Sequence, residues 1–239
     1  MSEVHSRGAA PPPPSTWGFL EAVLLYVISL VVAGVVIFGL FSAVASCRAR
    51  FLLGALTGQV VLASVVLVWV RYVKRTPLAS LGVPRRPLLD VALGMATGLG
   101  LYVVGVIVGA LVLVIATVVL GHRPDPPEQV VSCVRGAALL LSAPIIVLGA
   151  PLAEETFFRG FLYRGLRRRL SIWPAAVLSA LVFGVIHYAE PSYLLIIPSL
   201  AAVGLGLALL YERRQSLLAA IAAHASFNLV GFLLIAFTR

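Results

Sequence analysis

Long apolar runs constrain this chain more than any other feature of its sequence. They cover about residues 19–45, 51–70, 88–120, 136–163, 173–189, 193–210 and 217–237. A helix needs about 17–25 predominantly apolar residues to cross the hydrocarbon core of a bilayer. Since 61% of the residues are hydrophobic and 11% are charged, no polar stretch is long enough to cover a separate soluble core. The sequence therefore predicts an all-α fold, a polytopic transmembrane helix bundle of about seven spans.

The N-terminal end and one long run set the expected domain boundaries. Residues 1–18 include the consecutive prolines Pro11–Pro14 and carry little apolar surface to bury, so they are expected to form a disordered cytoplasmic leader. Residues 19–239 are expected to form a single transmembrane domain. The run 88–120 is longer than one span needs and contains five glycines. It could therefore form one span or break into two, which would add an eighth segment.

Positive charge is distributed unevenly between the two ends of the predicted spans. With seven spans, the loops on the side of the N-terminus hold 12 Lys and Arg residues, and the loops on the other side hold 5. The excess of Lys and Arg marks the cytoplasmic side. We therefore expect a multi-pass protein of the cytoplasmic membrane with a cytoplasmic N-terminus and an exterior C-terminus. This topology and contact with anionic lipids explain the net charge of +9, so no nucleic-acid partner is expected.

The two cysteines, Cys47 and Cys133, lie far apart in the sequence and form no Cys-x-x-Cys pair. On this spacing, neither is assigned a disulfide or a metal-binding role.

A few ionisable and amide side chains lie within the predicted spans, where each ionisable group costs about 2.5–3.5 kcal/mol on insertion scales. Those in the last four runs are Glu154, Glu155, Arg159, His187, His224 and Asn228. Glu155 and Arg159 are four residues apart on one helix face, as are His224 and Asn228, while Glu154 points about 100° away from Glu155. Counted at about 1.5 Å per residue from Arg164, Trp173 and Arg214, these groups reach similar depths. The sequence therefore predicts one polar site formed by three helices.

These residues fall into three motifs that resemble one known family. Glu-Glu-x-x-x-Arg is read at Glu154–Arg159, Phe-x-x-x-His at Phe183–His187, and His-x-x-x-Asn at His224–Asn228. In this order, on successive apolar helices, they are similar to the motifs of the CAAX-protease and bacteriocin-processing (CPBP, or Abi) family of intramembrane proteases. The resemblance covers about residues 136–237, which would be the catalytic core, and leaves the first three helices generic.

The resemblance implies an intramembrane endopeptidase that cleaves a membrane-associated peptide or protein. In that reading Glu154 and His187 orient and deprotonate a water molecule, while His224 and Asn228 hold the developing oxyanion. Glu155 either assists Glu154 or remains paired with Arg159, whose role would be structural. Glu154, His187 and His224 could also bind a catalytic zinc ion. The same residues can work without a metal, so the question of zinc stays open.

Two functions from other classes compete with this hypothesis. A proton-coupled transporter could use Glu154 and His187 as a proton relay, but it predicts internal repeats with matching broken helices, and the sequence has no evident repeat. A non-catalytic scaffold or immunity protein could retain the polar residues for packing alone, with Glu155 and Arg159 as a buried ion pair. The oligomeric state and the identity of the substrate do not follow from the sequence.

Overall fold

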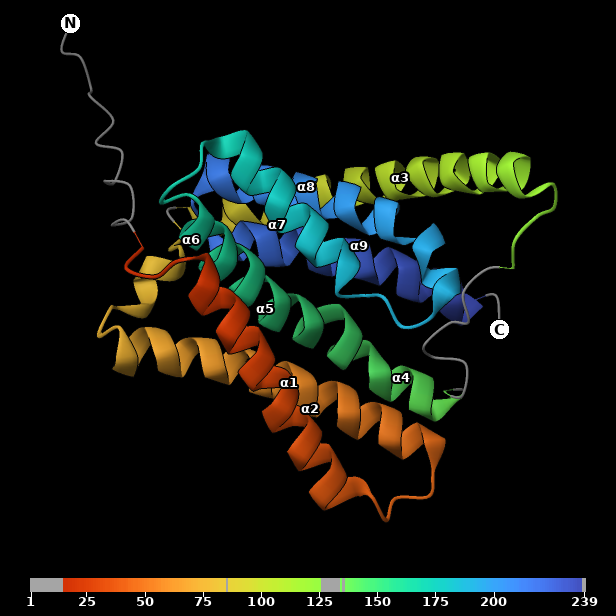
Figure 1. The fold of residues 1–239 in the computed structure, drawn as a ribbon, viewed down its shortest axis with the longest axis horizontal. Coiled ribbons are helices and arrows are strands. Elements are labelled where there is room, and N and C mark those ends of the chain that lie inside the picture. Colours follow the sequence, from red (N-terminus) through yellow and green to blue (C-terminus); the bar gives the residue numbers. More distant parts are fainter. Residues whose placement is uncertain (1–14, 85, 126–133, 135, 238–239) are drawn as a thin grey trace, which may run out of the picture.

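The computed structural model describes residues 15–84, 86–125, 134 and 136–237, and within them it is built of helices without a β-strand. The α-helices are α1 (Phe19–Phe41), α2 (Cys47–Val68), α3 (Pro87–Leu120), α4 (Ala137–Pro144), α5 (Ala150–Glu155), α6 (Arg164–Leu166), α7 (Ile172–Val185), α8 (Ile197–Arg214) and α9 (Leu217–Phe237). π-Helical segments follow at Trp69–Val73, Ile145–Gly149 and Thr156–Tyr163, and 3-10 turns at Leu78–Leu81 and Pro191–Leu195. Figure 1 shows the helices side by side in one bundle.

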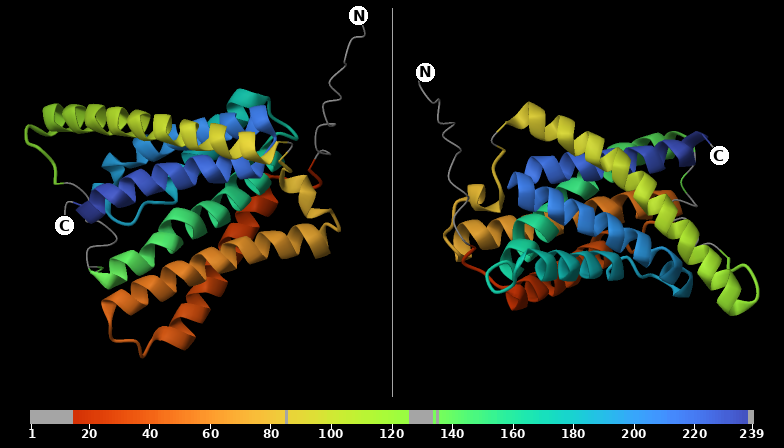
Figure 2. Two further views of the ribbon diagram at one scale, coloured as in Figure 1. Left: turned by 180° about the vertical axis from the view of Figure 1, so that it is seen from behind. Right: turned by 90° about the horizontal axis from the view of Figure 1, so that it is seen from above.

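The helices have the lengths and the apolar surfaces of a membrane protein, which confirms the predicted polytopic bundle. Among the described residues, five helical stretches are long and apolar enough to cross a bilayer: Phe19–Phe41, Cys47–Val73, Pro87–Leu120, Ala138–Leu166 and Leu217–Phe237. The other two predicted spans correspond to α7, which has 14 residues, and α8, which has 18. These two helices pack against each other and run in opposite directions within the bundle (Figures 1 and 2).

The long apolar run 88–120 forms one helix, so the eighth segment is absent. α3 has 34 residues, and a helix of this length measures about 51 Å, well over the thickness of the hydrocarbon core. It crosses the bundle obliquely and extends past its neighbours at one end (Figure 2). Its glycines do not break it, and two of them allow close packing against α9.

Small residues bring α3 and α9 together at this interface. A Cβ atom built on Gly94 would lie 2.5 Å from the carbonyl oxygen of Ala219, and one built on Gly98 would overlap the carbonyl oxygen of Ala223. The glycines and alanines thus form matching small-x-x-x-small patterns, which let helix backbones approach closely in a membrane. Ala223 directly precedes His224, so this contact positions one of the predicted site residues.

Gly98→Leu is therefore expected to destabilise the protein by about 1–3 kcal/mol, because the new side chain must push α9 away from α3. Thermal unfolding in detergent measures this effect. Gly100→Leu is the matched control, since a Cβ at Gly100 meets no atom within 4 Å. Equal unfolding temperatures for the two variants would show that the α3–α9 contact does not hold α9 in place.

The packed domain begins earlier than the sequence suggested. Trp17 is fully buried, stacks on Phe161 with a centroid distance of 4.8 Å and donates its indole N–H to the Phe161 carbonyl. Ser15 donates its hydroxyl to the carbonyl of Arg164. Residues 15–18 therefore belong to the helical domain and not to a leader. The sequence did not indicate this, because a single tryptophan next to a proline-rich segment produces no periodic pattern. Residues 1–14 lie outside the described residues.

The expectation for the cysteines was wrong at Cys47, which is disulfide-bonded. The expectation rested on spacing in the sequence, and residues far apart in the sequence can be close in the fold. Cys47 lies at the first turn of α2, where the chain returns from α1. Cys133 lies outside the described residues.

Candidate active site

An irregular helix carries the two adjacent glutamates. α5 is short, and π-helical segments precede and follow it, Ile145–Gly149 and Thr156–Tyr163. Pro151 lies in this helix and has no N–H to donate. π-Helical turns within α-helices often occur at functional sites, because they change the direction of the side chains that follow.

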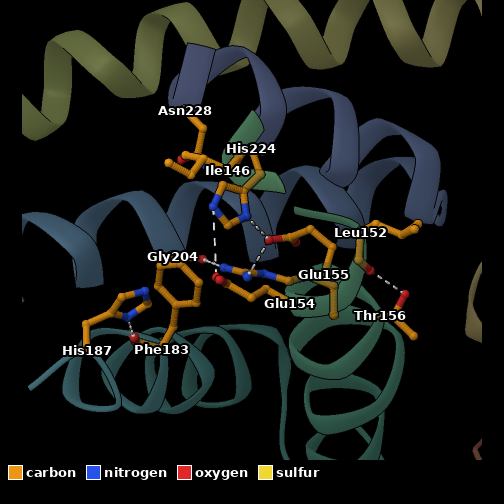
Figure 3. Close-up of polar contacts among 11 residues, drawn as sticks. Ile146, Leu152, Glu154, Glu155, Thr156, Phe183, His187, Gly204, His224 and Asn228 are labelled. Carbon is orange, nitrogen blue, oxygen red and sulfur yellow. Dashed lines mark hydrogen bonds and ion pairs between the residues drawn. The ribbon is translucent and has the colours of Figure 1, made fainter. Parts of the chain in front are cut away.

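Glu155 is the centre of a fully buried polar network. Its carboxylate has no exposed surface, and its Oε1 atom accepts hydrogen bonds of 2.8 Å from Arg159 Nη1 and from His224 Nδ1 (Figure 3). The ion pair between Glu155 and Arg159, which the spacing of four residues predicted, is confirmed. The bond to His224 links the 150–163 helix to α9, and the sequence pattern gave no sign of it.

Arg159 extends the network to α8 and α7. Its Nη2 atom donates a hydrogen bond of 2.9 Å to the carbonyl of Gly204, and its guanidinium lies 4.8 Å from the centroid of the Phe183 ring. Its Nε atom is buried and has no hydrogen-bond partner among the described residues, so the two Nη atoms hold the guanidinium in place. One arginine thus fixes the relative positions of three helices around Glu155.

Glu154 has a different environment from that of its neighbour. Its side chain is 20% exposed, and its Oε2 atom lies 4.0 Å from His224 Nε2. That oxygen is itself buried and has no hydrogen-bond partner among the described residues. A separation of 4.0 Å is too long for a direct hydrogen bond, but one water oxygen placed about 2.8 Å from each atom can bridge it. The two imidazole nitrogens of His224 therefore face two different glutamates.

His187 follows the end of α7 and lies at the edge of this cluster. Its Nδ1 atom is 2.7 Å from the carbonyl of Phe183, which must accept, so Nδ1 carries a proton. In the neutral imidazole Nε2 is then an acceptor. The Phe183 ring packs against both imidazoles, with centroid distances of 5.0 Å to His187 and 5.7 Å to His224 (Figure 3). In the described part of the chain, His187 makes no hydrogen bond or ion pair with Glu154.

Asn228 lies one helical turn beyond His224 and contacts the irregular helix. Its Nδ2 atom donates a hydrogen bond of 2.9 Å to the carbonyl of Ile146. In the π-helical segment, Ala150 N–H bonds to the Ile145 carbonyl, and the next donor in this pattern would be Pro151, which has none. Asn228 supplies the missing donor. It keeps a second N–H, because a primary amide has two.

The candidate metal ligands do not converge in the described part of the chain. There, no group of three or more His, Cys, Asp or Glu side chains is arranged to hold a metal ion. Nδ1 of His187 is bonded to a carbonyl and Nδ1 of His224 to Glu155. A catalytic zinc needs three protein ligands around one point, and Glu154, His187 and His224 do not provide that set. No chemical step is therefore assigned to a metal.

Comparison with known proteins gives a family match over the region that contains this site. Residues 136–230 match the model of the family described as type II CAAX prenyl endopeptidase Rce1-like. The chain is also 26% identical over 109 residues to a Bacillus subtilis protein named "Putative membrane peptidase YdiL". That match covers 46% of this chain and 42% of the relative. No solved structure matches the chain.

The matched region begins just before α4 and ends within α9, so it includes each residue of the polar cluster. It also includes the three motifs on which the resemblance to intramembrane proteases was based. Through residues 136–230, the chain is therefore similar to the Rce1-like family of type II CAAX prenyl endopeptidases.

Proposed function

We propose that this protein is an intramembrane endopeptidase that hydrolyses a peptide bond in a membrane-associated peptide or protein. The observation that carries this proposal is the 4.0 Å gap between the unpartnered Oε2 of Glu154 and Nε2 of His224. An acid and an imidazole held on either side of a space the size of one water molecule have the geometry required for general-base catalysis.

In the proposed reaction, the bridging water gives one proton to the Glu154 carboxylate while its oxygen attacks the carbonyl carbon of the substrate. Nε2 of His187 can accept a hydrogen bond from the second O–H of the water and so orient it, and this hydrogen stays on the oxygen. When the tetrahedral intermediate collapses, the C–N bond breaks and the proton held by Glu154 passes to the leaving nitrogen. The products are a carboxyl group and an amine, so all atoms are accounted for.

His224 and Asn228 are proposed to stabilise the oxyanion of the intermediate. Two carboxylates, Glu154 and Glu155, lie near one permanent cation, Arg159, and protonation of His224 on both nitrogens would balance the charge of the cluster. Glu155 would hold Nδ1–H, and Nε2–H, which contacts the bridging water before the attack, would donate to the oxyanion once that water has been added to the carbonyl carbon. The second N–H of Asn228 would be the other donor. Fixed donors of this kind are worth about 2.7–4 kcal/mol each in a site that excludes water.

The proposed orientation places the N-terminus in the cytoplasm. The arginines that follow α6 and those that end α8 lie at the same end of the bundle as the start of α1 (Figure 1), and an excess of cations marks the cytoplasmic side. Glu154 is ten residues from Arg164, which is about 15 Å along a helix. The reaction would therefore occur near the middle of the bilayer.

The test is cleavage of a library of membrane-tethered peptides by the purified protein in detergent. The wild-type protein is expected to cleave at least one peptide, and Glu154→Ala and His187→Ala are expected to leave that peptide intact. Cleavage that is unaffected by either substitution would contradict the mechanism. Addition of a chelator should not change the rate, whereas a loss that zinc restores would show that the reaction needs a metal.

A further inference from the structure

A cavity lies at the end of the bundle where α1 begins and α6 ends. Its volume is about 570 Å³, and it is lined mainly by apolar side chains from three helices. They include Phe19 and Leu20 of α1, Leu166 of α6 and Leu178 of α7. Leu20 is 80% exposed, so the apolar wall continues onto the surface that faces the hydrocarbon of the membrane. The cavity is separate from the cluster around Glu155.

Two arginines at the mouth of this cavity have no partner in the described part of the chain. Arg168 and Arg169 line it and are exposed, and neither guanidinium makes a hydrogen bond or an ion pair with a described residue. The one acidic lining residue, Glu21, forms a salt bridge with Lys74, in which Oε1 and Nζ are 2.7 Å apart. Neighbouring Arg167 is likewise neutralised by Glu212. Arg168 and Arg169 therefore provide positive charge that nothing within the described fold compensates.

The position of the arginines fits the boundary between lipid hydrocarbon and water. The apolar stretch Ala138–Leu166 ends two residues before Arg168, and the apolar stretch Phe19–Phe41 begins at the wall of the same cavity. At this level the phosphates of a bilayer lie beside the arginines and the acyl chains beside the leucines. The two arginines and the apolar wall are thus arranged in the same order as the charged head group and the acyl chains of a phospholipid.

We propose that this cavity binds one anionic phospholipid, with its phosphate between Arg168 and Arg169 and one acyl chain along the apolar wall. The two unpaired cations favour a lipid with net negative charge over a zwitterionic one. The apolar wall favours a lipid over free phosphate, which would leave that wall without a partner. This inference does not depend on the proposed peptidase reaction.

Binding can be tested with protein freed of lipid in a neutral detergent, to which phosphatidylglycerol or phosphatidylcholine is added at matched concentrations. Native mass spectrometry counts the lipids retained, and thermal unfolding measures the stabilisation. We expect one phosphatidylglycerol to be retained and to raise the unfolding temperature, with little effect from phosphatidylcholine. Inorganic phosphate at millimolar concentration should not reproduce the stabilisation.

The Arg168→Gln/Arg169→Gln variant is expected to bind phosphatidylglycerol at least about 10-fold more weakly. Both side chains are exposed, so the variant should fold normally. The control is Arg71→Gln/Arg213→Gln, which removes the same charge from exposed positions that do not line the cavity. Equal affinity in the two variants, or equal retention of the two lipids by the wild-type protein, would overturn the proposal. Displacement of the lipid by a soluble acidic peptide would also overturn it, because it would identify a peptide site.

Discussion

Replacement of Glu154 by glutamine is expected to lower the turnover number of the proposed peptidase by about 1,000-fold, because the amide keeps the shape of the side chain but cannot accept a proton. The Michaelis constant should change little. The unfolding temperature should stay within about 2 °C of the wild-type value, since Oε2 of Glu154 makes no hydrogen bond among the described residues that the fold could lose. Rates of peptide cleavage and thermal unfolding, measured on the same preparations, check both halves of this prediction.

Glu190→Gln is the matched control for that variant. Glu190 is exposed and contacts Ser192 in the segment between α7 and α8, so the substitution removes the same charge without touching the site. It is expected to leave the rate unchanged. A Glu154→Gln protein as fast as this control would show that Glu154 is not the base, and the scaffold hypothesis would then gain support.

The buried pair of Glu155 and Arg159 is expected to dominate stability. Glu155→Leu leaves the Arg159 guanidinium without its carboxylate in a site with no solvent exposure, which should cost about 3–5 kcal/mol. Glu155→Leu/Arg159→Met removes both charges and replaces them with apolar side chains of similar size, so most of that loss should be recovered. Reversible unfolding of the three proteins in mixed detergent measures these differences.

Activity is expected to behave differently from stability in this series. The double variant should remain inactive, since His224 loses the carboxylate that holds its Nδ1 atom and its Nε2 atom is no longer directed toward Glu154. Stability without activity would show that Glu155 positions His224 as well as stabilising the fold. A double variant that regains cleavage would mean that the network serves packing alone. If the double variant were as unstable as Glu155→Leu, the unpaired charge of Arg159 would not explain the loss in unfolding free energy.

The sequence predicted the local features of this site better than the contacts between helices. The pairing of Glu155 with Arg159 follows from the geometry of one helix, and so does the divergence of Glu154 from Glu155. The bond from His224 to Glu155 depends instead on how α9 packs against α5, which is set by the glycines of α3 and by α8. No periodicity in a single segment contains that information.

The irregular features were also outside the reach of pattern analysis. Hydropathy detects the apolar stretch 136–163 but not the π-helical segments within it, because the change in hydrogen bonding leaves composition unchanged. The contact of Asn228 with Ile146 follows from one of these segments. Trp17 was missed for a related reason, since it is a single residue whose partner, Phe161, lies far away in the sequence.

The central claim is that Glu154 and His224 share one water molecule within the bilayer. A crystal structure of the protein in a lipid phase, at a resolution that shows ordered water, tests it most directly. We predict one water oxygen within about 3.2 Å of both Glu154 Oε2 and His224 Nε2. A Glu154 side chain that is turned toward lipid, or bonded to another protein group with no water in common with His224, would contradict the proposed mechanism.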